Sequence, residues 1–235
     1  MTLANVATVK PLPLENGDHL SRQEFERRYA AMPHLKKAEL IEGVVYVPAA
    51  LRYRRHGKPH SAIMGWLAAY AAFTPGTEVA DNTTVRLDLD NEPQPDALLR
   101  IDEACGGQSR ISDDDYVEGA PELIVEIAAS SAAYDLYEKK TVYRRNGVRE
   151  YVVWQVAENK ISWYSLKDGD YVLLLPDDEG VVQSKIFPGL ELPVEALLKG
   201  DLATVLTQVQ RSITTDKHQA FVAQLDQKQD SQSSF

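Results

Sequence analysis

A carboxylate inside an otherwise apolar run is the feature that most limits how this chain can fold. Glu126 stands among the apolar residues of PELIVEIAASS (121–131). A nearly continuous apolar run of this length is typical of a buried strand. A buried carboxylate destabilises a fold unless it meets a metal ion, a cation or several hydrogen-bond donors. The sequence therefore requires a partner for Glu126 from another part of the chain.

The other segments alternate between helical and strand patterns. Ser21 and Glu24 form a capping-box pattern that begins one helix, and Pro33 ends it. The expected helices are 21–33, 63–73, 132–145 and 193–199. The expected strands are 39–47 (with a hairpin or bulge at Gly43), 85–89, 96–101, 123–127, 150–156, 160–166, 170–175 and 180–187. This order predicts an α/β (α+β) fold with a mixed central β-sheet flanked by the helices at 63–73 and 132–145.

The two ends of the chain differ in composition from its middle. Residues 1–19 contain proline and glycine without periodicity and are expected to form a flexible leader. Residues 20–211 are expected to form a single domain, and the Gln-, Ser- and Asp-rich residues 212–235 a polar tail that is either a frayed helix or disordered. One cysteine excludes an internal disulfide, no signal peptide is recognisable, and the longest apolar stretch is too short for a membrane span. We expect a cytoplasmic protein with no membrane association.

Three residues point to one kind of chemistry. Asp96 begins a short strand, Glu126 lies in the buried strand, and Lys139 lies on the helix that follows. Paired carboxylates are the oxygen ligands that Mg²⁺ prefers, and a lysine stabilises negative charge that develops on a phosphate. Together these residue types favour metal-assisted phosphodiester hydrolysis. Each also has a simpler explanation: a loop Asp, an edge or arginine-paired Glu, and a solvated Lys.

Further charged residues offer additional contacts. The segment 52–60 contains four cations and Tyr53, and it could bind phosphate and stack on a base, or simply be a solvated loop. The four expected phosphate contacts are Arg52, Arg54, Arg55 and Lys58. His60 is expected either to cap a helix or to lie beside the site. Either Glu39 or Glu42, with Glu39 favoured, is expected to join the metal shell, or both are simply solvated at a strand edge. Tyr143 and Tyr151 are expected in the core.

The order of these segments resembles the bacterial putative restriction endonuclease family of the PD-(D/E)XK nuclease-like superfamily. The resemblance runs from about Ser21 to Leu197. The matching segments are AELIEGVVYV (38–47), His60, QPDALL (94–99), PELIVEIAASS (121–131), DLYEKKTVYRRNGVREYVVW (135–154) and FPGLELPVEAL (187–197). It implies a restriction-endonuclease-like core with Asp96 and Glu126 as metal ligands, Lys139 as the catalytic lysine and Glu39 as an added acidic residue.

One departure from the superfamily pattern concerns the lysine. The usual lysine position, two residues beyond the glutamate, holds Ala128 here. The family supplies the lysine from the next helix, where Lys139 lies four residues after Asp135. Adjacent helical residues point about 100° apart, so only one of Lys139 and Lys140 can face the site.

Three functions agree with these patterns. The leading prediction is a Mg²⁺- or Mn²⁺-dependent endonuclease acting on DNA, and the superfamily resemblance implies a homodimer. A net charge of −10 disfavours tight binding to nucleic acid. It therefore keeps open a second prediction, an inactive nuclease-fold binding or assembly module. Hydrolysis of a smaller phosphoester is the third.

Overall fold

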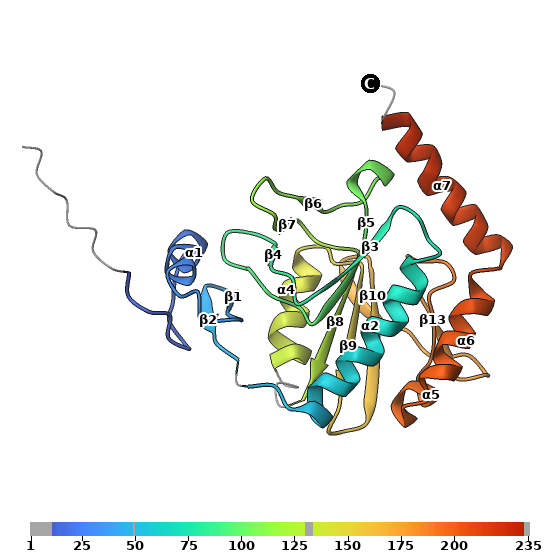
Figure 1. The fold of residues 1–235 in the computed structure, drawn as a ribbon, viewed down its shortest axis with the longest axis horizontal. Coiled ribbons are helices and arrows are strands. Elements are labelled where there is room, and N and C mark those ends of the chain that lie inside the picture. Colours follow the sequence, from blue (N-terminus) through green and yellow to red (C-terminus); the bar gives the residue numbers. More distant parts are fainter. Residues whose placement is uncertain (1–10, 49, 130–133, 233–235) are drawn as a thin grey trace, which may run out of the picture.

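A six-stranded mixed sheet forms the centre of the molecule (Figure 1). The computed structural model describes residues 11–48, 50–129 and 134–232. The strands lie in the order β11-β10-β9-β8-β5-β3, with β8 and β9 parallel and the other neighbours antiparallel. Their bounds are β3 (Thr77–Asp81), β5 (Ala97–Ile101), β8 (Leu123–Ala128), β9 (Glu150–Gln155), β10 (Lys160–Lys167) and β11 (Asp170–Leu173). The predicted mixed central sheet with flanking helices is confirmed.

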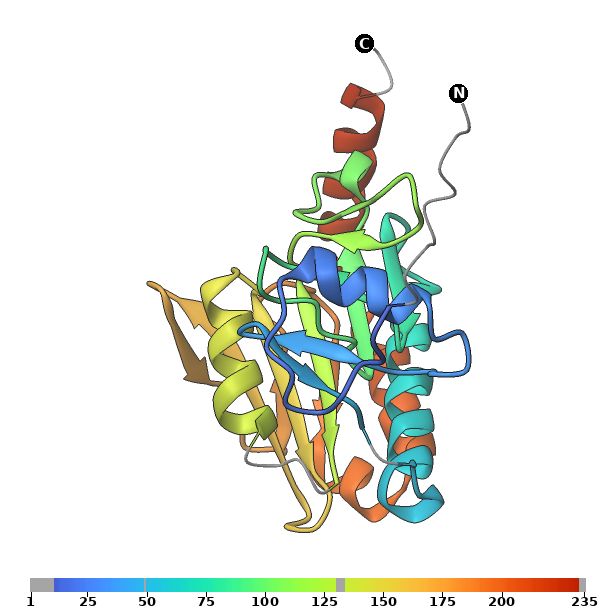
Figure 2. The same cartoon turned by 90° about the vertical axis from the view of Figure 1, so that its left-hand side faces the viewer.

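Helices cover both faces of this sheet. Ile63, Trp66, Leu67 and Tyr70 recur at helical spacing in α2 (Lys58–Ala71), and all four are buried against one face. The same core takes side chains from α5 (Val194–Lys199), α6 (Leu202–Ser212) and α7 (Asp216–Gln232). The opposite face is covered by α4 (Lys140–Arg145), which follows a π-helical turn, η3 (Asp135–Lys139). Figure 2 shows α2, in cyan, and α4, in yellow-green, on opposite sides of the sheet.

The alternation of β8 decides where Glu126 points. Leu123, Val125 and Ile127 pack in the core under α2, while Ile124 and Ala128 belong to the core under α4. Successive side chains of a strand point to opposite faces. Glu126 therefore shares the α4 face, between Ile124 and Ala128.

An N-terminal unit lies beside the sheet, at the left of Figure 1. It consists of α1 (Arg22–Ala30) and the hairpin of β1 (Glu39–Ile41) and β2 (Val44–Tyr46). The side chain of Ser21 caps α1 by accepting a hydrogen bond from the backbone N–H of Glu24. Glu42 and Gly43 form the hairpin turn with φ of 51° and 74°, as a tight two-residue hairpin requires.

Short elements complete the described structure. They are η1 (Tyr53–Gly57), β4 (Val85–Arg86), η2 (Glu103–Cys105), β6 (Arg110–Ile111), β7 (Val117–Glu118), β12 (Val181–Gln183) and β13 (Glu191–Pro193). The segment 52–60, expected as a loop, is instead a π-helical turn that continues into α2, because buried His56 and Pro59 anchor it. The expected strands at 85–89 and 180–187 shorten to β4 and β12.

The two ends of the chain carry structure where they are described. Leu14 is buried, and the backbone N–H of Gly17 donates to the carbonyl of Val45. At the other end His218 and Leu225 of α7 are buried. Residues 1–10, 233–235 and the predicted helix start at 132–133 lie outside the described residues.

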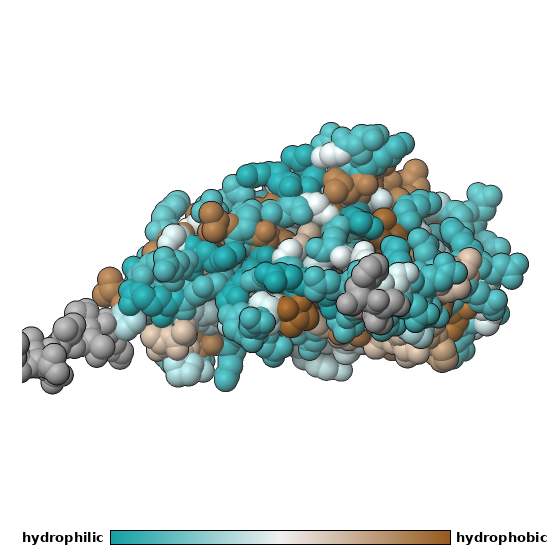
Figure 3. Space-filling view, turned by 90° about the horizontal axis from the view of Figure 1, so that it is seen from above, coloured by the Kyte–Doolittle hydropathy of each residue, from teal (hydrophilic) through white to brown (hydrophobic). Residues whose placement is uncertain are grey.

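The face drawn in Figure 3 is mostly hydrophilic, with small separate apolar areas. In the described part of the chain, no helix combines the length and apolar character needed to cross a membrane.

Candidate functional site

Strand register brings Asp96 next to Glu126. Ala97 of β5 pairs with Val125 of β8, so the residue before β5 comes opposite the residue after Val125. Asp96 Oδ2 accepts a hydrogen bond of 2.7 Å from the backbone N–H of Ile127. Two carboxylates therefore lie on adjacent strands at the same end of the sheet.

Lys139 joins Glu126 to a third carboxylate. Its Nζ donates to Glu126 Oε1 at 2.9 Å and to Glu39 Oε1 at 2.7 Å. Glu39, Asp96, Glu126 and Lys139 each expose 4% of their surface or less. Lys140 points elsewhere, with its Nζ 3.6 Å from the ring centre of Tyr164. Of the two adjacent lysines, only Lys139 thus meets the acidic cluster.

Two basic side chains that the sequence pattern did not connect with Asp96 lie beside its carboxylate. Lys37 Nζ lies 3.3 Å and His56 Nε2 3.1 Å from Asp96 Oδ1. Burial raises the pKa of Asp96, but the hydrogen bond from His56 and the charge of Lys37 outweigh burial and leave that pKa well below its ordinary value. Asp96 is consequently a carboxylate at neutral pH. His56 belongs to the basic segment already noted in the sequence, but nothing local marks Lys37.

His60 contacts the backbone of Asp96 rather than its side chain. Its Nε2 lies 2.8 Å from the carbonyl oxygen of Asp96 and 3.0 Å from Asp81 Oδ1. His60 thus lies beside the site, which is one of the two positions expected for it.

The surroundings of Glu126 shift its pKa in opposing directions. Burial raises the pKa of Glu126, the positive charge of Lys139 lowers it and the nearby charge of Asp96 raises it, with a net pKa of about 8. The hydroxyl of Tyr143 donates to Glu126 Oε1 at 2.8 Å. Tyr143 is buried in the core as expected, and its hydroxyl adds a hydrogen bond that the sequence did not indicate.

These residues line a pocket of about 750 Å³. The residues that form its wall are Asn16, Lys37, Glu39, Tyr46, Val47, Pro48, Ala50, Leu51, Arg52, Arg55, His56, Asp96, Glu126, Ile127, Ala129, Tyr134, Asp135, Tyr137, Glu138 and Lys139. Arg52, Arg54, Arg55 and Lys58 are all exposed, but only Arg52 and Arg55 reach this wall. The expected phosphate contacts therefore divide into a pair at the pocket and a pair outside it.

The donor set suits a hard divalent cation. Within residues 11–48, 50–129 and 134–232, no group of three or more His, Cys, Asp or Glu side chains is arranged to hold a metal ion. Protein sites for Mg²⁺ commonly use one or two carboxylates and complete the shell with water and phosphate oxygens. Asp96 and Glu126 supply such a pair of oxygen donors on adjacent strands. The residues present thus fit Mg²⁺ or Mn²⁺.

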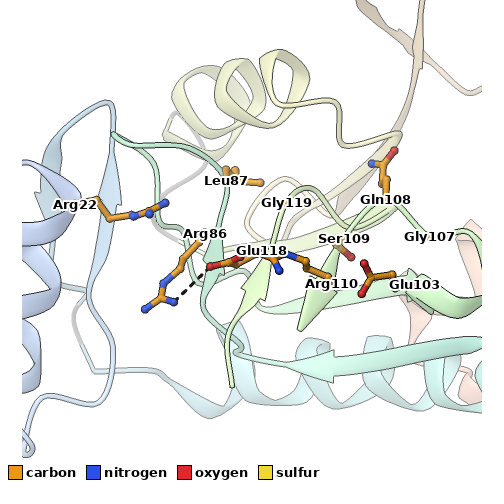
Figure 4. Close-up of a pocket in the computed structure, with 10 residues that line it drawn as sticks. All are labelled: Arg22, Arg86, Leu87, Glu103, Gly107, Gln108, Ser109, Arg110, Glu118 and Gly119. Carbon is orange, nitrogen blue, oxygen red and sulfur yellow. Dashed lines mark hydrogen bonds and ion pairs between the residues drawn. The ribbon is translucent and has the colours of Figure 1, made fainter. Parts of the chain in front are cut away.

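A second pocket, of about 410 Å³, is lined by Arg22, Arg86 and Arg110 (Figure 4). Its arginines already have acidic partners. Arg86 lies 2.9 Å from Glu26 and 2.9 Å from Asp114, and Arg110 lies 2.5 Å from Glu118. These ion pairs neutralise the cations, so this pocket is a weaker candidate for phosphate binding than the first.

Comparisons with known proteins give a family for the chain and a solved structure of similar fold. Residues 22–195 match the profile of the Uma2 family, described as "Putative restriction endonuclease". The search of curated proteins found no match. Among solved structures, the fold is similar to a putative nuclease belonging to DUF820 from Anabaena variabilis ATCC 29413, with a TM-score of 0.54 and 12% identity. The alignment covers 69% of this chain and 89% of that chain.

Proposed function

This chain belongs to the Uma2 family, described as "Putative restriction endonuclease", and from that premise we propose a metal-dependent nuclease that hydrolyses phosphodiester bonds in DNA. One observation carries the proposal: Lys139 and the carboxylates of Glu39, Asp96 and Glu126 converge at one pocket. Basic side chains at the same wall supply cations where phosphate would enter.

Each residue has a distinct role in this proposal. Asp96 and Glu126 would hold Mg²⁺ or Mn²⁺. When bound, the ion would neutralise charge on the attacked phosphate and activate water as the nucleophile. Lys37 and His56 keep Asp96 ionised and fixed in direction. Lys139 would face the negative charge that develops during hydrolysis.

Arg52 and Arg55 would contact phosphates that flank the reacting group. Guanidinium groups bind phosphate oxygens through paired hydrogen bonds. We also propose a homodimer, the assembly that the superfamily resemblance implies.

A second candidate function is an inactive binding module with the same fold. The observation that favours it is the ion pairing of Lys139, which satisfies Glu39 and Glu126 without a metal ion. The net charge of −10 also opposes binding to DNA.

Cleavage of supercoiled plasmid at low salt, with Mg²⁺ or Mn²⁺, tests the two functions. The wild type should nick the plasmid only with metal, and the Asp96→Asn/Glu126→Gln double variant should not. The matched control is Asp170→Asn/Glu195→Gln, which removes two exposed carboxylates and should cut normally. If no protein cuts DNA or RNA while Mg²⁺ binds to the wild type and the control but not to the double variant, the inactive module is the better conclusion.

A further inference from the structure

The depth of the pocket restricts what can reach its carboxylates. Asp96 and Glu126 expose 4% of their surface or less and line a space of about 750 Å³. Carboxylates this deeply buried are out of reach of the backbone of a rigid duplex that lies on the surface. An unpaired nucleotide, by contrast, can turn away from its neighbours and enter a pocket.

Aromatic side chains line the same pocket. The rings of Tyr46 and Tyr134 pack with their centres 4.3 Å apart, and both residues belong to the pocket wall. Tyr137, also in the wall, is 71% exposed. Aromatic faces of this kind bind the π-face of any base and thus need no particular base sequence.

One polar atom beside the rings lacks a partner. The hydroxyl of Tyr134 is buried and makes no hydrogen bond to any residue that the structure describes. A buried hydroxyl is normally hydrogen-bonded, so an unpaired one calls for an explanation. A ligand in the pocket would provide a partner for it.

The cations of the pocket lie with these aromatic residues. Arg52 and Arg55 are exposed and line the wall that Tyr46 and Tyr137 also form. Proteins that bind single strands combine a basic groove for the backbone with aromatic platforms for the bases. The pocket combines both features, which the second pocket, with its paired arginines, does not.

We infer that this pocket receives an unpaired nucleotide of a single-stranded nucleic acid, with the base against Tyr46 and Tyr134 and the phosphates toward Arg52 and Arg55. The inference rests on the proposed nuclease function and names its substrate class. Base-paired DNA would be a substrate only where a strand end or an unpaired segment enters the pocket.

Binding without cleavage provides the test. Fluorescence anisotropy in EDTA at low salt would compare the full chain with labelled oligo-dT, the matching single-stranded RNA and a blunt duplex of equal length. We expect either single strand to bind at least about 10-fold more tightly than the duplex. Equal or tighter binding of the duplex would overturn the inference.

Tyrosine variants locate the binding site. Tyr46→Leu should weaken single-strand binding about 5- to 100-fold, because stacking is lost, whereas Tyr46→Phe should retain it. Tyr137→Ala changes an exposed side chain, so it tests the same surface without endangering the fold. Phe73→Ala removes an exposed ring beyond the end of α2 and serves as the control. Unchanged binding in both Tyr46→Leu and Tyr137→Ala would also overturn the inference.

The binding assay and the cleavage assay test the two proposals separately. Plasmid nicking by a protein that does not prefer single strands would leave the nuclease proposal standing and reject this inference. Preferential single-strand binding through Tyr46, with no cleavage of any substrate, would support this inference and reject the nuclease.

Discussion

Glu126 and Glu150 are buried carboxylates on the neighbouring parallel strands β8 and β9, and they face opposite sides of the sheet. Glu126 lies on the face covered by α4, whereas Glu150 contacts Trp163 of the core under α2. Burial raises the pKa of Glu126 to about 8 and that of Glu150 to about 7. A raised pKa therefore does not distinguish a functional carboxylate from a structural one in this molecule.

The partners of the two residues do distinguish them. Glu150 accepts hydrogen bonds from neutral donors: Trp163 Nε1 at 3.2 Å, Ser184 Oγ at 2.8 Å and the backbone N–H of Lys185 at 2.6 Å. It does not belong to the wall of the large pocket. Glu126 instead meets an ammonium group, lies next to Asp96 and lines that pocket. Charged partners and access to a pocket, more than burial, identify the candidate site.

The largest difference between the two positions should appear in the rate of DNA cleavage. Glu126→Gln keeps an acceptor oxygen for Lys139 and Tyr143 but removes the carboxylate that would hold the metal ion. We expect nuclease activity to fall at least about 100-fold, because metal binding supplies several kcal/mol of transition-state stabilisation. Glu150→Gln should leave the activity of the folded fraction unchanged. Initial rates of plasmid nicking measure both, and equal activity in the two variants would remove Glu126 from the proposed site.

Glu150, unlike Glu126, is expected to contribute to the stability of the fold rather than to catalysis. Glu150→Gln places an amide N–H₂ group among the donors that now face a carboxylate, so at least one donor loses its acceptor. We expect the free energy of unfolding to fall by about 2 kcal/mol. Urea denaturation measures this change, and Glu195→Gln, at an exposed position, should stay within about 0.5 kcal/mol of wild type. A Glu150→Gln variant as stable as wild type would show that its three hydrogen bonds contribute little.

The raised pKa of Glu150 predicts a pH dependence. The folded protein holds this proton up to about pH 7, whereas the ordinary pKa of 4.5 applies when the chain unfolds. The resulting contribution to stability is complete below about pH 4.5 and is lost as the pH rises through about 7. The Glu150→Gln variant has no titrating group at this position, so it does not lose this contribution as the pH rises. The stability gap between wild type and variant should narrow from pH 5 to pH 8 by on the order of 1–2 kcal/mol. A gap that widens with pH would contradict the sign of the shift.

The smallest expected effect is stabilisation by the metal ion. Mg²⁺ at a few times its Kd should add about 1 kcal/mol to the stability of the wild type. This corresponds to a rise in Tm of a few degrees, measurable by thermal unfolding with and without EDTA. Glu150→Gln should show the same rise and Glu126→Gln should not. An identical rise in both variants would place the ion away from Glu126.

The fold was largely predictable because its elements are local. The apolar run of β8, the spacing of Ile63 and Trp66 in α2 and the Ser21 cap each depend on neighbouring residues alone. The predictions were wrong where tertiary contacts override the local pattern. The basic segment at 52–60 folds into a helical turn because His56 is buried against Asp96, which lies 40 positions further along the chain.

The sequence by itself determined the family, the strand that carries Glu126 and the need for a partner to that carboxylate. Only the tertiary structure decided which side chains meet there. It selects Lys139 over Lys140 through the rotation of the helical segment, and it brings Lys37 and His56 to Asp96. The physical reason is distance along the chain. The periodicity of a segment indicates on which face of its own helix or strand a residue lies. The contact between Glu39 and Lys139, which are 100 positions apart, depends instead on how separate elements pack.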